Sequence, residues 1–125
     1  MTTLRFTTEH EWLRREDDGT ITIGISDYAQ EQLGDIVYVE LPEVDADIDS
    51  GANLVVIESV KAVGEISMPI AGSIAAVNER LADEPEIVNT APLGDGWLVR
   101  IAPADADAIE EFMDEADYQA FIAAL

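Results

Sequence analysis

Glu58-Ser59-Val60-Lys61-Ala62-Val63 joins two predicted strands, which run from Asn53 to Glu58 and from Ala62 to Ser67. The first strand is mostly apolar, and the second can run back beside it as its antiparallel partner. Such a hairpin would place Lys61 at its tip, exposed and away from the core. A turn this tight usually contains Asn-Gly or Asp-Gly. Because neither is present, we infer that the tip sequence serves something other than turn stability.

Lys61 is the only lysine among the 125 residues, and the other five basic residues are all arginine. Arginine can replace lysine as a surface cation, but its guanidinium stays protonated and is a poor nucleophile. A lysine amine can lose its proton, attack an acyl donor and become an amide. The pattern therefore indicates a modified lysine, with the chance survival of one surface lysine as the simpler alternative.

The chain is strongly acidic, with 27 acidic and six basic residues and a formal charge of -21. Nucleic acid and anionic membrane surfaces are poor partners, because both require clustered cations. Since 48% of the residues are hydrophobic and recur in strand-like runs, we predict a folded domain rather than a disordered acidic chain. Salt screens the repulsion in such a protein, so a halophilic source is a hypothesis that would also explain the scarcity of lysine.

The chain contains no cysteine, which excludes disulfides and cysteine metal sites. The N-terminus lacks a basic region followed by an apolar core, and no apolar run approaches the roughly 18 residues of a membrane span. We therefore expect a cytoplasmic protein with no membrane partner. The length favours one domain, residues 1–125, and we expect a monomer.

Short strands and turns precede and follow the hairpin. Strict period-two alternation predicts a strand at residues 21–25. Ser26 is a good N-cap, and Gly34 a plausible C′ residue, for a helix of about two turns. Further strands are expected at residues 4–6, 12–15, 36–41, 73–78 and 97–101.

The pattern changes to helix after Pro103. Apolar residues then recur at three- and four-residue spacings, which predicts a C-terminal helical segment at about residues 105–124. Asp107 and Glu110 resemble a capping box at the start of this segment. We expect the apolar side of the segment to pack on the sheet.

The following short motifs occur in order along the chain: His10-Glu11-Trp12, Ser26 to Asp35, Val39-Glu40-Leu41-Pro42, Glu58 to Ala62, Val77-Asn78, Val88-Asn89 and Gly96 to Val99. Together they resemble the H-protein family of the glycine cleavage system. The resemblance covers about residues 5–122, and the shared order and spacing make it far more specific than any one motif. It implies a mainly β fold with C-terminal helices: a lipoyl-carrier flattened β-sandwich, or barrel-sandwich hybrid, with the modified lysine on a hairpin.

The resemblance implies a carrier protein rather than an enzyme, with (R)-lipoate attached covalently at Lys61 as N6-lipoyllysine. Such a carrier takes the aminomethyl group of glycine from the P-protein (glycine decarboxylase) to the T-protein (aminomethyltransferase). The L-protein (dihydrolipoyl dehydrogenase) reoxidises the arm, and a lipoylating enzyme is the fourth implied partner. A lipoyl-relay paralogue, which donates lipoyl groups to other lipoyl-dependent enzymes, would share these motifs and stays open as an alternative.

Two other classes of protein fit less well. A biotin carrier would be expected to have methionines beside its lysine, and a 2-oxo-acid dehydrogenase lipoyl domain to have Asp-Lys-Ala, whereas this chain has Val60-Lys61-Ala62. A stand-alone hydrolase or binding protein would keep its activity or its ligand in Lys61→Arg, which a carrier would not.

The resemblance also implies roles for residues other than the lysine. Glu11 matches the family's acidic residue in the cleft that shelters the loaded arm, where it could hold a cationic amine. Glu65 stands where an acidic residue follows the modified lysine, although Val63-Gly64 before it departs from the commoner small-polar pair. Glu58 and Ser59 are expected to help the lipoylating enzyme recognise the tip.

No catalytic residue and no metal site is expected. His10 is the only histidine, and a histidine of unperturbed pKa can act as an acid or a base near neutral pH. It has neither a nucleophile motif nor the convergent ligands that zinc requires. We therefore expect His10 to pack or hydrogen-bond beside Trp12.

Overall fold

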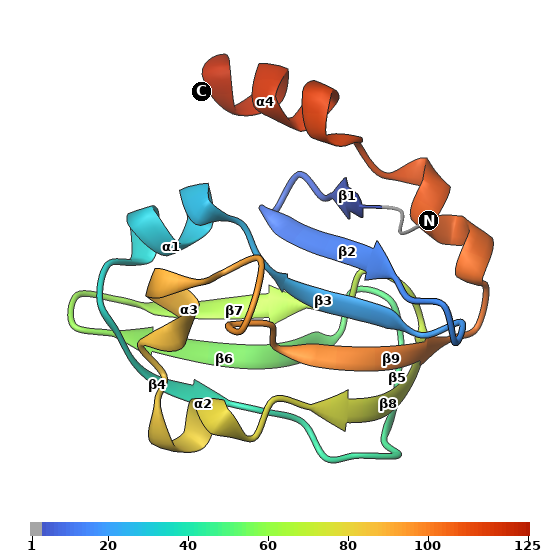
Figure 1. Cartoon of the computed structure of the whole chain (residues 1–125), viewed down its shortest axis with the longest axis horizontal. Coiled ribbons are helices and arrows are strands. Elements are labelled where there is room, and N and C mark those ends of the chain that lie inside the picture. The colour runs from blue at the N-terminus through green and yellow to red at the C-terminus, as the bar shows by residue number, and fades with distance from the viewer. Residues whose placement is uncertain (1–3) are drawn as a thin grey trace.

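The computed structural model describes residues 4–125, which form two antiparallel sheets with short helices around them (Figure 1). The larger sheet has six strands in the order β1-β2-β3-β9-β8-β5, and the smaller has three in the order β4-β6-β7. The predicted mainly β class is confirmed. The strands are β1 (Leu4–Phe6), β2 (Glu11–Arg15), β3 (Ile21–Ile25), β4 (Ile36–Glu40), β5 (Asp47–Ile48), β6 (Asn53–Ser59), β7 (Val63–Ser67), β8 (Gly72–Val77) and β9 (Val99–Pro103).

Side chains from both sheets meet in one hydrophobic core. Ile21, Ile23 and Ile25 of β3 are fully buried in it, as is Ile57 of β6. Because side chains alternate across a strand, the neighbours of Ile57 on β6 point to the opposite, outer face of the smaller sheet. A second, smaller core contains Phe6, Trp12 and Tyr118.

The helix predicted between Ser26 and Gly34 is present as α1 (Asp27–Leu33). The Ser26 hydroxyl accepts a hydrogen bond from the Ala29 N–H, which satisfies one of the free donors of the first turn. Gly34 ends the helix with a φ of 82°, in the region that favours glycine. Two further one-turn helices, α2 (Arg80–Asp83) and α3 (Ile87–Thr90), lie between β8 and β9.

The C-terminal helical segment is divided into two parts. The first is a 3₁₀ helix, η1 (Ala106–Glu111), and the second is α4 (Glu115–Ala123). Between them, Phe6 and Met113 exchange two backbone hydrogen bonds of 2.8 and 3.0 Å. A helix continuing through Met113 could not make this strand-like pair, so the long-range contact overrides the local helical pattern.

The capping box predicted at Asp107 and Glu110 was therefore wrong. The side chain of Asp105 caps η1 by accepting a hydrogen bond from the Asp107 N–H. Asp114 caps α4 by accepting one from the N–H three residues later. The N-caps are thus Asp105 for η1 and Asp114 for α4, and neither belongs to the predicted capping box. Their acidic side chains suit the positive N-terminal ends of the two helices.

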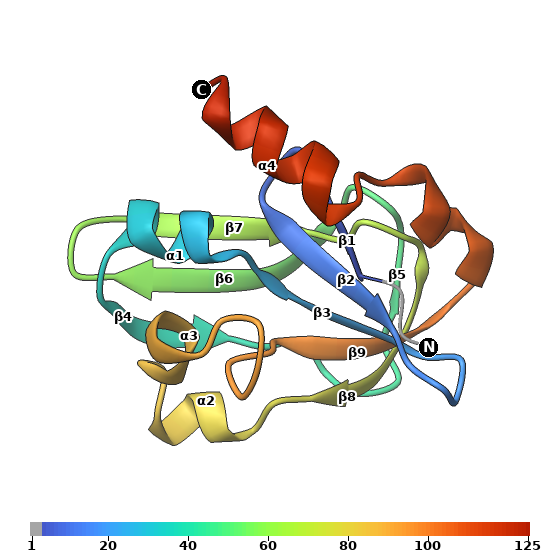
Figure 2. The same cartoon turned by 45° about the horizontal axis from the view of Figure 1, so that its top comes forward.

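Helix α4 lies over β1, which is an edge strand of the larger sheet (Figure 2). The rings of Phe6 and Tyr118 stack there, with centroids 4.3 Å apart and planes within 5° of parallel. No helix within residues 4–125 is long and apolar enough to cross a membrane.

Candidate functional site

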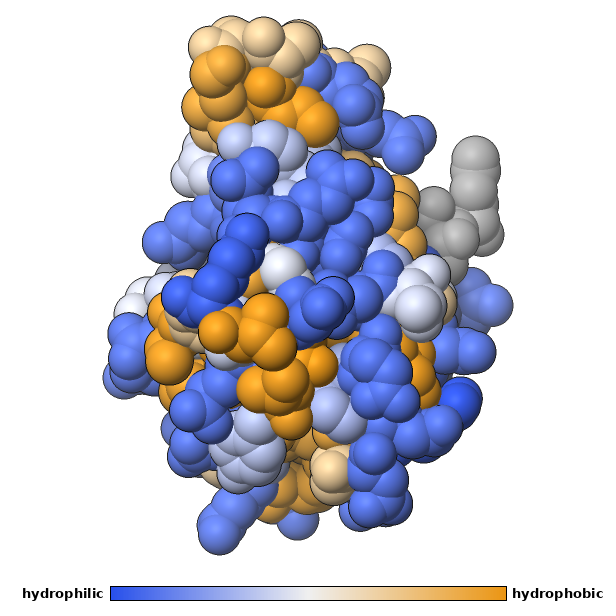
Figure 3. All heavy atoms as spheres, turned by 90° about the vertical axis from the view of Figure 1, so that its left-hand side faces the viewer, coloured by the Kyte–Doolittle hydropathy of each residue, from blue (hydrophilic) through white to orange (hydrophobic). Residues whose placement is uncertain are grey.

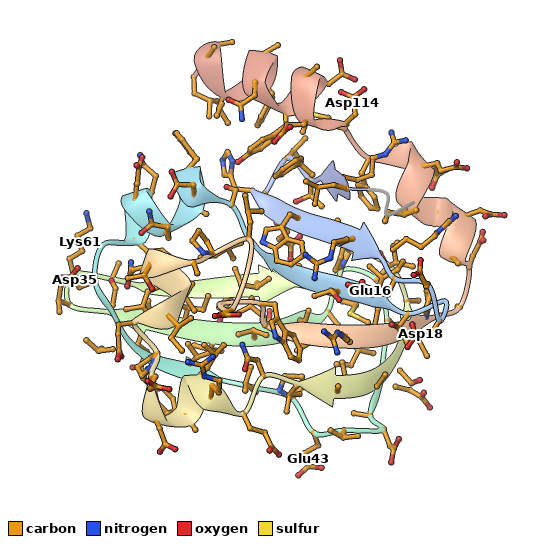
Figure 4. The ribbon with its side chains drawn as sticks, in the orientation of Figure 1. Glu16, Asp18, Asp35, Glu43, Lys61 and Asp114 are labelled. Atoms are coloured by element: carbon orange, nitrogen blue, oxygen red, sulfur yellow. The ribbon has the colours of Figure 1, made fainter. Side chains whose placement is uncertain are left out.

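β6 and β7 form the antiparallel hairpin that the sequence predicts, and Lys61 lies exposed in the turn between them. The last pair of the ladder is Glu58 with Val63, so the tip consists of the four residues between them. Figure 4 shows Lys61 at the edge of the molecule near Asp35, with its side chain directed away from both sheets. Its amine is thus presented to solvent, clear of the core.

The hydroxyl of Ser59 holds the turn together. It accepts hydrogen bonds from the N–H of Lys61 (3.3 Å) and of Ala62 (3.0 Å), and it donates to the carbonyl oxygen of Ala62 (3.1 Å). The Ser59 N–H donates to the same carbonyl at 2.8 Å. A serine that bonds to the backbone in this way can stabilise a turn, which explains how the tip forms without Asn-Gly. This structural role of Ser59 adds to the part in recognition that the family resemblance implies.

The loop after α1 is hydrogen-bonded to the tip. The Val60 N–H donates to the carbonyl oxygen of Asp35 at 3.0 Å. Asn89, on α3, holds this loop with both ends of its amide. The Asn89 side chain accepts from the Ile36 N–H and donates to the Gly34 carbonyl oxygen, both at 2.9 Å. Asn89 belongs to one of the family motifs, but no local pattern in the sequence predicts this role.

The stem of Lys61 passes directly over Gly34. A Cβ atom added to Gly34 would lie 2.9 Å from Cε of Lys61 and 3.5 Å from its Nζ. The first distance is shorter than carbon atoms approach without repulsion. The exposed end of the lysine side chain can move aside, so glycine is favoured here mainly by its backbone conformation.

We expect Gly34→Ala to displace the Lys61 side chain. Gly19→Ala is a matched control, because Gly19 has a φ of 90° and nothing within 4 Å of an added Cβ. Gly34 combines its positive φ with a ψ of -159°, a conformation that is essentially restricted to glycine, so Gly34→Ala should lose on the order of 1–3 kcal/mol of stability. Gly19→Ala should lose about 1–2 kcal/mol from its positive φ. After reductive methylation with ¹³C-formaldehyde, the single lysine gives one side-chain signal, which should shift in Gly34→Ala and not in Gly19→Ala. Unchanged signals in both variants would contradict the contact.

A cavity of about 510 Å³ opens at the other end of β7 from the tip. Its wall comes from four parts of the chain: residues 6–9 and 11, residues 50–51, residues 67–69 and residues 111–113. The five residues of β7 span about 17 Å at roughly 3.3 Å per residue. The cavity and the lysine therefore lie on the same strand, separated by its length.

Glu11 is the buried acid of this cavity, with only 1% of its surface exposed. The Thr7 hydroxyl donates to its Oε1 at 3.2 Å, whereas Oε2 is buried without a hydrogen-bond partner among the described residues. Burial, followed by the charge of nearby Glu9, raises the pKa of Glu11 to about 8, against the opposing effect of the Thr7 hydrogen bond. At neutral pH the carboxyl group is therefore mostly protonated.

The structure does not bring Glu65 together with Glu11. Glu65 pairs with Val56 in the middle of β7 and is exposed, and it does not line the cavity. It lies on the outer face of the smaller sheet, as does Glu58 near the tip. Of the sequence-predicted residues, Glu58 and Ser59 thus lie beside the lysine, Glu11 lines the cavity, and Glu65 lies on the strand between them.

His10 is held by residues far away in sequence. Its Nδ1 is 2.9 Å from the hydroxyl of Tyr118 on α4, in a hydrogen bond, and its ring packs on Tyr28 with centroids 4.6 Å apart. Burial lowers the pKa of His10. The expected neighbour Trp12 instead donates its indole N–H to the Pro92 carbonyl oxygen. Among residues 4–125 no group of three or more histidine, aspartate or glutamate side chains is placed to hold a metal ion.

Comparisons with known proteins agree with these features. A family model described as "Glycine cleavage H-protein" matches residues 4–124. The glycine cleavage system H protein of Pseudoalteromonas atlantica is 53% identical over 116 residues, which cover 93% of this chain and 90% of the relative. That of Psychrobacter sp. is 50% identical over 117 residues, covering 94% and 93%. The crystal structure of a glycine cleavage system H protein from Mycobacterium marinum superposes with a TM-score of 0.86 at 32% identity, covering 96% of both chains.

Proposed function

The chain belongs to the glycine cleavage H-protein family, and from this premise we propose that Lys61 carries (R)-lipoate in amide linkage. The protein is a carrier component of the glycine cleavage system and not itself a catalyst, and proteins of this family carry lipoate. One observation supports the assignment of the attachment site above all others. The only lysine of the chain stands exposed at the tip of a hairpin.

The hairpin tip suits covalent attachment. None of the ion pairs within residues 4–125 involves Lys61, so no carboxylate has to be displaced before the amine reacts. The hydrogen bonds of Ser59 and Asp35 fix the backbone on which the lysine stands. Amide formation removes one positive charge, which takes the formal charge from -21 to -22. The arm thus starts from a fixed base.

We propose the P-protein, the T-protein and the L-protein as partners, and a lipoylating enzyme that recognises Glu58 and Ser59. When attached, the lipoyl group supplies thiol–disulfide chemistry at the end of a flexible tether. The protein holds that tether at a defined place and so gives each partner a high effective concentration of it. We further propose that the chain acts as a monomer in the cytoplasm.

We propose that the cavity at Glu11 shelters the cationic amine that the arm carries. A positive charge beside a carboxyl group favours its ionised form. Because the pKa of Glu11 is about 8, entry of an ammonium group near neutral pH would release the Glu11 proton to solvent. Glu65 lies outside this cavity, so its contribution would be on the surface between the tip and the cavity.

Reconstitution with the three partner enzymes tests the function. The lipoylated chain, mixed with the P-, T- and L-proteins, glycine, tetrahydrofolate and NAD⁺ as the electron acceptor of the L-protein, should support release of ammonia and formation of the one-carbon folate product. The unlipoylated chain is the control and should support neither. A lipoylated chain that is inactive here, but passes its lipoyl group to another lipoyl-dependent enzyme, would be a relay protein.

A further inference from the structure

Exposed apolar side chains gather around Lys61. Val60 and Val63, which flank it in sequence, are 69% and 65% exposed, and Val37 and Tyr38 of neighbouring β4 are 53% and 48% exposed. These four residues, the tip patch, are most of the large apolar side chains that residues 4–125 expose. Figure 3 shows an apolar area in the middle of this face, surrounded by hydrophilic side chains. Burying such side chains is favourable, so their concentration here points to a partner.

Strand pairing explains why the tip patch lies on one surface. Tyr38 on β4, Glu58 on β6 and Val63 on β7 are direct cross-strand neighbours, which forms one row across the sheet. Side chains in such a row share a face. Val37 lies at the irregularity in the β4–β6 ladder, and the Val60 backbone is bonded to the residue before β4. Tyr38 and Val63 thus stand on paired strands, whereas Val37 lies at the irregularity of the ladder and Val60 lies in the turn, where its backbone is hydrogen-bonded.

The patch has an acidic edge. Lys61 is the only basic residue between residues 35 and 67. Glu58 stands in the same row as Tyr38 and Val63. The next row on the same face, farther from the tip, contains Glu40 and Glu65. A second copy of the chain would bring carboxylates against carboxylates, which is unfavourable. The complementary surface has an apolar centre and a rim of lysine or arginine.

We propose that the tip patch is the docking surface of the enzyme that acylates Lys61. This inference rests on the proposed function. An enzyme that acts on Nζ must bring its active site within one lysine side chain of the turn, so its surface has to cover the neighbouring valines. Enzymes that act on the far end of the arm can stay farther from the turn. The acylating enzyme is therefore the partner that has to contact Val60 and Val63, and Val37 and Tyr38 of β4 extend the apolar surface that it would meet.

In the reaction at this surface, Nζ of Lys61 attacks the carbonyl carbon of an acyl adenylate, which the enzyme forms from lipoate and ATP with release of pyrophosphate. The new N–C bond replaces the bond between that carbon and the phosphate oxygen, and AMP leaves. The lysine starts as an ammonium ion and releases two protons to solvent as it becomes a neutral amide. No oxidant or reductant is needed.

A double variant, Val60→Thr with Val63→Thr, tests the proposal. Threonine keeps the branched shape that suits these positions and replaces a methyl group with a hydroxyl group. Val44→Thr is the control, because Val44 is 49% exposed and lies before β5, outside the hairpin. With a purified lipoate ligase, lipoate and ATP, kcat/KM for acylation should fall about tenfold in the double variant, mainly through KM, and less than twofold in the control.

Chemical acetylation of Lys61 by an amine-reactive ester should proceed equally in all three proteins, because the amine itself is unchanged. Enzymatic acylation of the double variant at the wild-type rate would overturn the docking proposal and leave the proposed function standing. A wild-type chain that the ligase does not acylate would overturn both. If sedimentation shows that wild type self-associates and the double variant does not, the patch is a contact between copies and the docking proposal is wrong.

Discussion

Lys61→Arg should fold normally, accept no lipoate and support no glycine–bicarbonate exchange by the P-protein. The arginine keeps the positive charge and most of the length of the side chain, but its guanidinium does not lose its proton to become a nucleophile. Lys61 is exposed and free of ion pairs among the described residues, so the free energy of unfolding should change by less than about 0.5 kcal/mol. Radiolabelled bicarbonate exchange and urea unfolding measure the two effects.

A second variant separates the hairpin from the mere presence of a lysine. Lys61→Arg combined with Arg80→Lys moves the single lysine to α2, where Arg80 is 57% exposed in surface ion pairs of small energetic value. This chain should remain unlipoylated and inactive. Undiminished exchange in Lys61→Arg would refute the carrier mechanism, and lipoylation at the new lysine would show that the tip is not what the ligase recognises.

Glu11→Gln should make the protein more stable at pH 8.5 and leave it nearly unchanged at pH 5. The pKa of Glu11 is about 8 in the folded state against a model value of 4.5. Below pH 4.5 the carboxyl group is protonated in both states, and its contribution to stability is complete. As the pH rises towards 8, the unfolded state binds fewer protons, so stability is lost. The amide has no such charge to desolvate.

The shift of the pKa from 4.5 to about 8 corresponds to a gain of on the order of 5 kcal/mol for Glu11→Gln at pH 8.5. Urea unfolding at both pH values measures it, with Glu65→Gln as a control that changes an exposed carboxylate outside the cavity. A difference between Glu11→Gln and wild type that does not grow with pH would show that Glu11 is ionised in the folded state.

The same pair of variants tests whether Glu11 shelters the loaded arm. Loaded Glu11→Gln should accept the group but release free aldehyde faster than wild type, because it has lost the carboxylate that holds the amine. Glu65→Gln should release it at the wild-type rate. Equal release from all three proteins would remove Glu11 from the proposed cleft.

Local signals in the sequence were sufficient to predict the parts of the fold that local interactions determine. The apolar strands on either side of Lys61 predicted the hairpin, and Ser26 with Gly34 predicted the ends of α1. The C-terminal segment could not be predicted in the same way, because its break depends on Met113 pairing with Phe6 at the opposite end of the chain.

The site shows the same division. The tip could be predicted because one turn contains it, whereas the cavity at Glu11 is assembled from four separate parts of the chain. The clamp of Asn89 on the loop at Gly34 joins α3 to the residues after α1. Periodicity and composition carry no information about such contacts, although Glu11 and Asn89 both belong to the family motifs.

The attachment of lipoate to Lys61 is the central claim, and the mass of the peptide that contains Lys61 tests it most directly. The protein should be purified from its native host and digested, and that peptide should be sequenced by tandem mass spectrometry. We expect the mass of a lipoyl amide on Lys61. A biotin adduct, or an unmodified lysine in a host that lipoylates its other carriers, would contradict the account.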